Sequence, residues 1–184
     1  MVRRWSSRSA FTHPFQTFAN FISFHRCWLW DYLRYSNSAG FFLPLSGGLD
    51  SCSTATLVYS MCRIVVRALH DGNPQVHRDV VRIAGPYHPE GWLPQDAKEL
   101  CGTLLSTAYL GMSAQSSSET RSRAQRFAEA IGSKHTSMEI QPIFQAFQDV
   151  FTKSTNFQPS FDGSTAEDLA LQNLQARSRM VMCE

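Results

Sequence analysis

Residues 40–51 read GFFLPLSGGLDS, and this stretch sets the architecture of the chain. Residues 41–45 form a short, continuous apolar run, which is typical of a buried strand. The Ser46-Gly47-Gly48 segment interrupts the run, and apolar residues then recur at helical spacing. The residues that carry this spacing are Ala55, Val58, Tyr59, Cys62, Val66 and Leu69. The stretch therefore predicts a strand, a glycine turn and a helix in direct succession.

Upstream of this unit, residues 27–36 read CWLWDYLRYS and predict a short apolar helix that ends before Gly40. The side chains expected on its apolar face are Trp28, Leu29, Tyr32 and Leu33.

Downstream, the alternation of strands and helices continues. Asp71-Gly72-Asn73-Pro74 is a helix stop, and the proline-rich residues 73–100 predict a partly helical excursion that ends in a loop. Further strands are expected at residues 103–110, which could equally begin as a helix, and at residues 135–140. Further helices are expected after Ser116 up to Ile131, at residues 142–151 and at residues 166–181.

Two serines mark helix starts in the second half of the chain. Ser116 with Glu119, and Ser164 with Glu167, have the spacing of a capping box. Strands that alternate with helices predict an α/β fold with a doubly wound parallel sheet. In such sheets ligands bind outside the carboxyl ends of the strands, so the glycine turn is the expected site.

Composition narrows the function classes. The chain has 184 residues, 43% hydrophobic and 17% charged, which fits one globular domain. Lys plus Arg 17 against Asp plus Glu 15 leaves +2, too little for a protein that coats nucleic acid. The apolar runs look too short for a membrane span, which predicts a soluble protein. Five scattered cysteines without a CxxC pair predict neither a disulfide framework nor a zinc site, and favour the cytoplasm.

The glycine turn has the residue types of a phosphate-binding loop. Glycines let backbone N–H groups approach an anion, and the start of the following helix adds partial positive charge. Serine hydroxyls can donate to phosphate oxygens. Asp50 would repel a bare phosphate, so it is a candidate ligand for a Mg²⁺ ion bound together with a nucleotide.

A purely structural interpretation of the turn stays open at this point. Gly47 and Gly48 could simply make a tight connection, with Asp50 or Ser51 as a helix cap. Neither a Walker GxxxxGK[ST] loop nor a GxGxxG fingerprint is present in the turn.

The six residues SGGLDS resemble the SGGxDS loop of the ATP pyrophosphatase superfamily, the PP-loop enzymes. The surrounding chain resembles the synthetase domain of eukaryotic glutamine-dependent NAD synthetases. Four ordered blocks carry this resemblance: CWLWDYLRYS, GFFLPLSGGLDSCSTATLVYSMCR, TAYLGMSAQSSSETRSRAQRFAEAIGSKH and EDLALQNLQARSRM. The resemblance implies an adenine nucleotide alpha hydrolase-like fold.

The resemblance also implies roles for individual residues. The loop for the pyrophosphate of ATP would comprise Pro44, Leu45, Ser46, Gly47, Gly48, Leu49, Asp50 and Ser51. Ser46 would be its catalytic centre, and Asp50 would face Mg²⁺. Arg177 matches an arginine that the family uses near deamido-NAD, whereas Asp168 replaces the family's commoner asparagine.

The family reaction is the ATP-dependent amidation of deamido-NAD. The nicotinate carboxylate attacks the α-phosphate of ATP, which gives an adenylated acid and pyrophosphate, and ammonia then displaces AMP. The implied partners are ATP, Mg²⁺, deamido-NAD and ammonia from a glutaminase domain. Two alternatives stay open: a catalytically inactive nucleotide-binding module that pairs with full-length subunits, and another PP-loop enzyme such as a GMP synthetase.

The resemblance further predicts the organisation of the chain. Residues 27–184 are expected to be a partial synthetase domain, truncated at its C-terminus and without the glutaminase domain. Residues 1–26 are expected to be a disordered segment or alternative start foreign to the family, although their arginines and serines without acidic residues also fit a mitochondrial transit peptide. The full-length family enzyme is expected to be a homo-oligomer.

Overall fold

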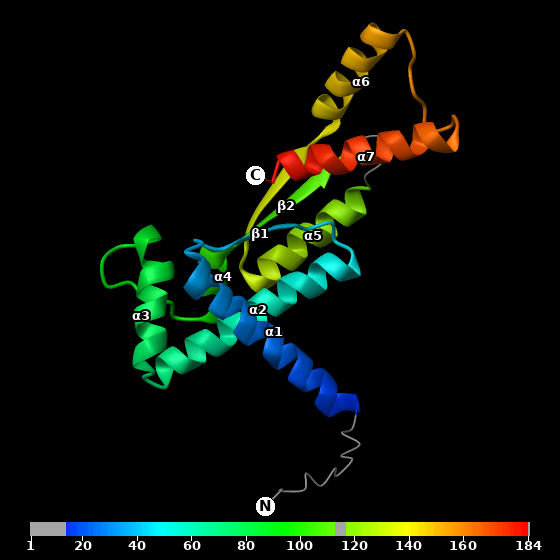
Figure 1. The fold of residues 1–184 in the computed structure, drawn as a ribbon. Coiled ribbons are helices and arrows are strands. Elements are labelled where there is room, and N and C mark those ends of the chain that lie inside the picture. Colours follow the sequence, from blue (N-terminus) through cyan, green and yellow to red (C-terminus); the bar gives the residue numbers. More distant parts are fainter. Residues whose placement is uncertain (1–13, 113–116, 184) are drawn as a thin grey trace, which may run out of the picture.

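The computed structural model describes residues 14–112 and 117–183, and its centre is a sheet of three parallel strands (Figure 1). The strands are β1 (Phe41–Pro44), β2 (Leu105–Gly111) and β3 (Lys134–Glu139), in the spatial order β1-β2-β3. The predicted parallel α/β sheet is confirmed.

Helices lie between and around the strands in the predicted order. Their bounds are α1 (Pro14–Ser36), α2 (Leu49–His70), α3 (Pro74–Ile83), the short 3₁₀ helix η1 (Gly85–Tyr87), α4 (Ala97–Leu104), α5 (Ser118–Ile131), α6 (Gln141–Thr155) and α7 (Thr165–Val181). The strand expected at residues 103–110 starts later, because α4 runs directly into β2 without a loop. The helix expected from residue 27 begins earlier, at Pro14.

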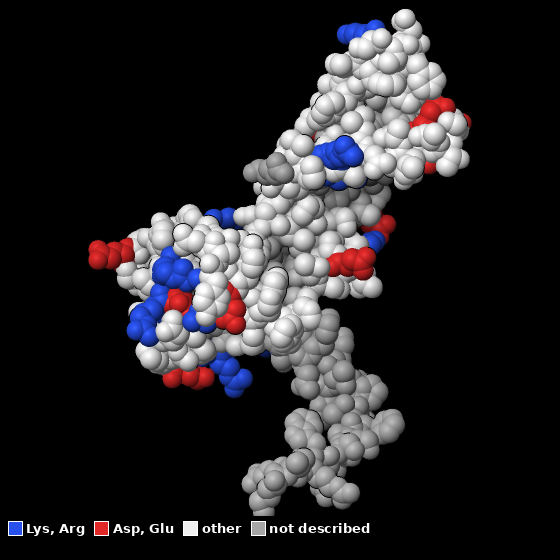
Figure 2. Space-filling view, viewed as in Figure 1, with Lys and Arg blue, Asp and Glu red and all other residues white. Residues whose placement is uncertain are grey.

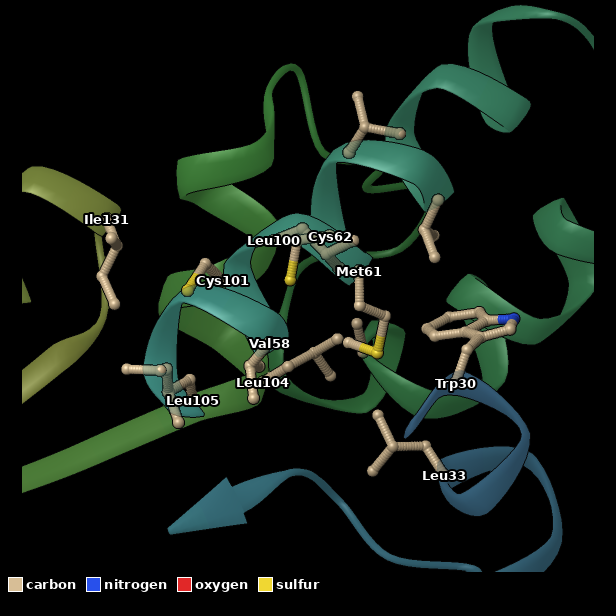
Figure 3. Packing of buried hydrophobic residues seen from close by; sticks show 14 of the residues in the cluster. Trp30, Leu33, Val58, Met61, Cys62, Leu100, Cys101, Leu104, Leu105 and Ile131 are labelled. Atoms are coloured by element: carbon tan, nitrogen blue, oxygen red, sulfur yellow. The ribbon is translucent and has the colours of Figure 1, made fainter. Parts of the chain in front are cut away.

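Both faces of β2 are buried. Alternate side chains of a strand point to opposite sides, so β2 contributes to two separate hydrophobic clusters. Leu105 and Tyr109 belong to a large cluster with residues of α1, α2, α4 and α5, part of which Figure 3 shows. The opposite face packs against α6 and α7. The buried members of this second cluster are Ala108, Leu110, Met112, Ile140, Phe144 and Leu171. Helices on both faces confirm the doubly wound arrangement.

The predicted apolar face of α1 is partly wrong. Trp30 and Leu33 are the buried residues, and Figure 3 shows both pointing toward α2. Trp28 and Tyr32 are 54% and 46% exposed. Their rings pack on each other at 5.7 Å, and Tyr32 stacks on Phe41 at 6.3 Å. Because α1 has aromatic residues on two sides, spacing alone selects the wrong one.

One of the two predicted helix caps is shifted. Ser117, not Ser116, is the N-cap of α5, and its hydroxyl accepts from the Thr120 N–H. Ser116 lies outside the described residues. The second prediction is confirmed, because Ser164 and Glu167 form a complete capping box at the start of α7.

The prediction that every apolar run is too short for a membrane span is wrong for helix α2. Residues 49–70 are long and apolar enough by length and composition, although only a third (33%) of the most apolar window is buried. The apolar side chains that α2 buries, such as Val58 and Met61, lie in the main core (Figure 3). A core helix passes the same test of composition, so α2 is weak evidence for a membrane.

Charged side chains of both signs lie next to each other over α3 (Figure 2). Asp79 is 6% exposed, and its carboxylate lies 2.9 Å from Nε of Arg34 at the end of α1. Gln75 donates to the same carboxylate at 3.1 Å. Asp79 thereby ties α3 to α1.

Candidate functional site

The segment between β1 and α2 is a tight loop at the carboxyl edge of the sheet. Leu45 is fully buried, and its N–H donates to the Ala108 carbonyl at 2.8 Å, so the loop starts from a fixed point beside β2. Gly47 has φ +77°, a conformation that glycine adopts without steric cost. Gly48 is the extended N-cap residue of α2. The chain therefore turns at Gly47 and enters the helix at Leu49.

Ser46 and Ser51 hold the two ends of the loop together. Their hydroxyl oxygens lie 3.1 Å apart. The Gly48 N–H donates to Ser46 Oγ at 3.2 Å, and Ser51 Oγ donates to the Gly48 carbonyl at 3.2 Å. Ser46 is exposed, so it orders the loop and stays accessible to a ligand.

Helix α2 presents its N-terminus to the same space. The Cys52 N–H donates to the Gly48 carbonyl at 3.1 Å, whereas the N–H groups of Leu49, Asp50 and Ser51 precede the first helical acceptor. The dipole of this 22-residue helix adds partial positive charge there. An anion in front of the loop would meet both the free N–H groups and the dipole.

The loop is seated against α5. A Cβ atom placed on Gly47 would lie 2.6 Å from the Thr120 carbonyl oxygen and 3.2 Å from the Ala124 nitrogen, both backbone atoms of α5. Gly47 is therefore required by its φ angle and by its contact with α5 at the same time.

A pocket of about 430 Å³ opens beside the loop, at the carboxyl ends of β1 and β2. Its lining residues are Pro44, Leu45, Ser46, Ala108, Tyr109, Leu110, Ser117, Thr120 and Arg179. Of the eight predicted loop residues, the first three line the pocket, and Gly47 to Ser51 form the turn and the start of α2. The position matches the expected ligand site of a doubly wound sheet.

Hydroxyl groups order the part of the pocket wall that β2 and the start of α5 form. Tyr109 is 5% exposed, and its phenol oxygen lies 2.8 Å from Thr120 Oγ1. Thr120 Oγ1 also donates to the Ser117 carbonyl at 2.9 Å. Sequence reasoning assigned the start of α5 a capping role alone, although Ser117 and Thr120 stand in one of the blocks that carry the resemblance.

The arginine in this pocket is Arg179. Its Nε donates to the Leu110 carbonyl at the end of β2, at 3.4 Å. Arg177 is exposed on α7 and does not line the pocket, so its predicted role stays a prediction. Two residues along a helix correspond to about 200° of rotation, so the two side chains point to different sides. Sequence reasoning missed Arg179 because it could not tell which side of α7 faces the sheet.

Asp50 lies in the first turn of α2 and is exposed. Over residues 14–112 and 117–183, no group of three or more His, Cys, Asp or Glu side chains converges as a metal site. Mg²⁺ commonly binds through one or two carboxylates, phosphate oxygens and several waters. One exposed carboxylate beside the predicted phosphate-binding loop fits that pattern, so Asp50 is compatible with a Mg²⁺ ion that arrives with a nucleotide.

A larger groove, about 500 Å³, lies between α6 and α7. Phe147, Phe151, Phe157 and Leu174 are among the apolar side chains that dominate it. It offers a phosphate few polar partners, so the pocket beside Ser46 is the better candidate for a nucleotide.

Comparison with known proteins assigns the family. The family model described as NAD synthase matches residues 22–183. The chain belongs to the NAD synthase family. The match starts five residues before the domain start expected at Cys27, and that boundary stays a prediction.

Relatives within the family include long, glutamine-dependent members. The chain is 50% identical over 159 residues to the glutamine-dependent NAD(+) synthetase of Rattus norvegicus, which covers 85% of this chain and 21% of the rat protein. It is 49% identical to the glutamine-dependent NAD(+) synthetase of Dictyostelium discoideum, over 85% of this chain and 22% of the Dictyostelium protein. The chain thus spans about a fifth of the length of the curated relatives it matches.

Solved structures agree with this assignment. A glutamine-dependent NAD(+) synthetase from Cytophaga hutchinsonii matches with a TM-score of 0.73 and 29% identity, over 88% of this chain and 27% of the other. A glutamine-dependent NAD+ synthetase from Acinetobacter baumannii, solved in complex with adenosine diphosphate, matches with a TM-score of 0.59 and 19% identity. This match covers 97% of this chain and 24% of the Acinetobacter chain. The second likeness supports the fold alone.

Proposed function

We propose that this chain supplies the ATP-binding part of a glutamine-dependent NAD synthetase, a ligase of NAD biosynthesis. The observation that carries the proposal is the Ser46–Ser51 loop, which places free helix N–H groups, two serine hydroxyls and one carboxylate beside an open pocket. The 50% identity to the rat synthetase supports the substrate class.

In this proposal the loop binds the β- and γ-phosphates of ATP. The N–H groups at the start of α2 and the Ser46 hydroxyl donate to phosphate oxygens, and they stabilise the charge that develops when pyrophosphate leaves. Asp50 holds Mg²⁺, which neutralises phosphate charge when bound. Ser46 is already fixed by Ser51 and Gly48, so little reorganisation is required when ATP binds.

The proposed chemistry is the reaction that the resemblance to glutamine-dependent NAD synthetases implies. A carboxylate oxygen of deamido-NAD attacks the α-phosphorus, and the bond from that phosphorus to the bridging oxygen breaks and releases pyrophosphate. Ammonia then attacks the acyl carbon of the adenylated acid, AMP departs with the bonding electron pair, and the nitrogen loses a proton. No side chain acts as a nucleophile, so binding and orientation supply most of the acceleration.

The first experiment measures binding of ATP with Mg²⁺ to the 184-residue chain by calorimetry. Ser46→Ala removes a charge-assisted donor, and we expect about a 10- to 100-fold weaker affinity. Ser53→Ala is the matched control, because Ser53 is an exposed serine on α2 that does not line the pocket. Equal affinities of Ser46→Ala and the unmodified chain would contradict the proposed loop.

A second experiment tests Asp50 as a Mg²⁺ ligand. We expect Asp50→Asn to weaken ATP binding in Mg²⁺ but not in EDTA, where the ion is absent for both proteins. A similar loss in EDTA would assign Asp50 another role.

A third experiment tests the reaction by release of pyrophosphate from ATP, deamido-NAD and ammonium. Release that requires deamido-NAD supports the ligase. Binding of ATP without release would favour the nucleotide-binding module, and release without deamido-NAD would favour another PP-loop enzyme.

A cytoplasmic location, a homo-oligomer of the full-length enzyme and the absence of nucleic-acid and membrane partners stay predictions.

A further inference from the structure

Arg179 is held at the pocket by the packing of α7. The buried residues Leu171, Gln175 and Ser178 define the face of α7 that meets the sheet. Arg179 follows Gln175 by four positions, so it lies on the same face, one turn further along. Its Nε donates to the Leu110 carbonyl at 3.4 Å, which fixes the base of the guanidinium at the carboxyl end of β2.

This contact uses one of the five N–H groups of the guanidinium. Arg34, Arg82, Arg121 and Arg123 each have a carboxylate within 4.0 Å. For Arg179, no carboxylate lies within that distance in the part of the chain that the structure describes. A partly buried cation without a counter-ion is unfavourable, and it favours the binding of an anion.

The other polar groups of the pocket suit the same kind of ligand. Ser46 presents an exposed hydroxyl group, and Arg179 is the charged residue among those that line the described pocket. A guanidinium with two free terminal nitrogens matches two oxygens of one phosphate group.

We propose that Arg179 binds a phosphate group of ATP in the pocket that it lines together with Ser46 of the Ser46–Ser51 loop. This inference rests on the proposed function, and it assigns a ligand-binding role to an arginine other than Arg177. The Leu110 carbonyl orients the guanidinium before ATP arrives, which reduces the entropy lost on binding.

The test is calorimetric titration of the 184-residue chain with ATP and Mg²⁺. We expect Arg179→Gln to weaken binding about 10- to 100-fold, the usual effect of losing one charge-assisted hydrogen bond. Arg179→Lys keeps the charge and should recover part of the lost affinity. Arg126→Gln is the matched control, because Arg126 is exposed on α5 and does not line the pocket.

Thermal unfolding separates ligand binding from a structural role. The bond to Leu110 is long, so we expect Arg179→Gln to lower Tm by at most about 2–4 °C, the shift that corresponds to one modest hydrogen bond in a chain of this size. Weaker binding together with a fall in Tm of more than about 8 °C would assign Arg179 a structural role and overturn the inference.

The outcomes also separate this inference from the proposed function. If the unmodified chain does not bind ATP, the proposed function fails and the inference fails with it. A different result would overturn the inference alone. In that case the unmodified chain binds ATP and Ser46→Ala weakens binding, but Arg179→Gln leaves the affinity unchanged.

Discussion

Gly47 offers the sharpest test of how the loop is built, because two separate effects oppose any side chain there. At φ +77° an alanine is strained by about 1–2 kcal/mol relative to glycine. Its Cβ would also lie 2.6 Å from the Thr120 carbonyl oxygen, a backbone atom that moves only with α5. Overpacking of this kind costs about 1–3 kcal/mol. Gly47→Ala should therefore lower the free energy of unfolding by about 2–5 kcal/mol.

Gly72 provides a matched control with the same backbone angle. It also has φ +77°, but a Cβ there would meet nothing within 4 Å. Gly72→Ala should cost only the strain of about 1–2 kcal/mol. The loss of entropy in the unfolded chain is the same for both substitutions, so it cancels in the difference. The difference between the two variants, about 1–3 kcal/mol, therefore measures the overlap with α5.

The assay is equilibrium unfolding in urea, followed by tryptophan fluorescence, to which the buried Trp30 contributes. In a thermal scan, each kcal/mol corresponds to about 2–4 °C in a domain of this size. If Gly47→Ala and Gly72→Ala have the same free energy of unfolding within about 0.5 kcal/mol, the loop does not rest on α5, and the reasoning about Gly47 is refuted.

Four further substitutions test other parts of the fold. Thr107→Val removes a buried hydroxyl that lies 2.9 Å from His135 Nδ1. Urea unfolding should show that the free energy of unfolding falls by about 1–3 kcal/mol. An unchanged free energy of unfolding would mean that the contact is not formed. Glu167→Gln tests the capping box. The backbone N–H groups of Ser164 and Ser160 hold the pKa of the Glu167 carboxyl below its ordinary value of 4.5. The wild-type protein should therefore have its full advantage in Tm above pH 4.5 and lose it as the pH falls through the lowered pKa. A wild-type advantage that does not decrease as the pH is lowered below 4.5 would contradict this. Trp30→Ala should cost about 3–5 kcal/mol in urea unfolding and Trp28→Ala less than about 1 kcal/mol, and the reverse order would contradict the described orientation of α1.

Local signals in the sequence predicted much of the fold. The apolar run before Ser46 predicted β1, and the glycine turn predicted the start of α2. Capping spacing at Ser164 predicted the start of α7, because the two residues that form the box are close in sequence. The parallel sheet followed from the alternation of elements.

Features that depend on tertiary packing could not be obtained in the same way. Which side of α1 is buried depends on where α2 lies, and the apolar spacing alone favoured the exposed Trp28 and Tyr32. Which of Arg177 and Arg179 reaches β2 is the same problem on α7, where about half a turn of rotation separates the two side chains. The seating of Gly47 on α5 joins residues more than seventy positions apart, which no local pattern reports.

The order β1-β2-β3 has a consequence for the folding pathway. Ser106 pairs with Lys134 across about 28 residues, whereas Phe41 pairs with Leu105 across about 64. Closing the longer connection costs about 0.7 kcal/mol more chain entropy. The β2-α5-β3 unit is therefore expected to form early in folding, and β1 to join it later. Because the Ser46 loop follows β1 directly, this loop would be among the last parts of the chain to become ordered. A ligand bound there would therefore slow unfolding more than it speeds folding.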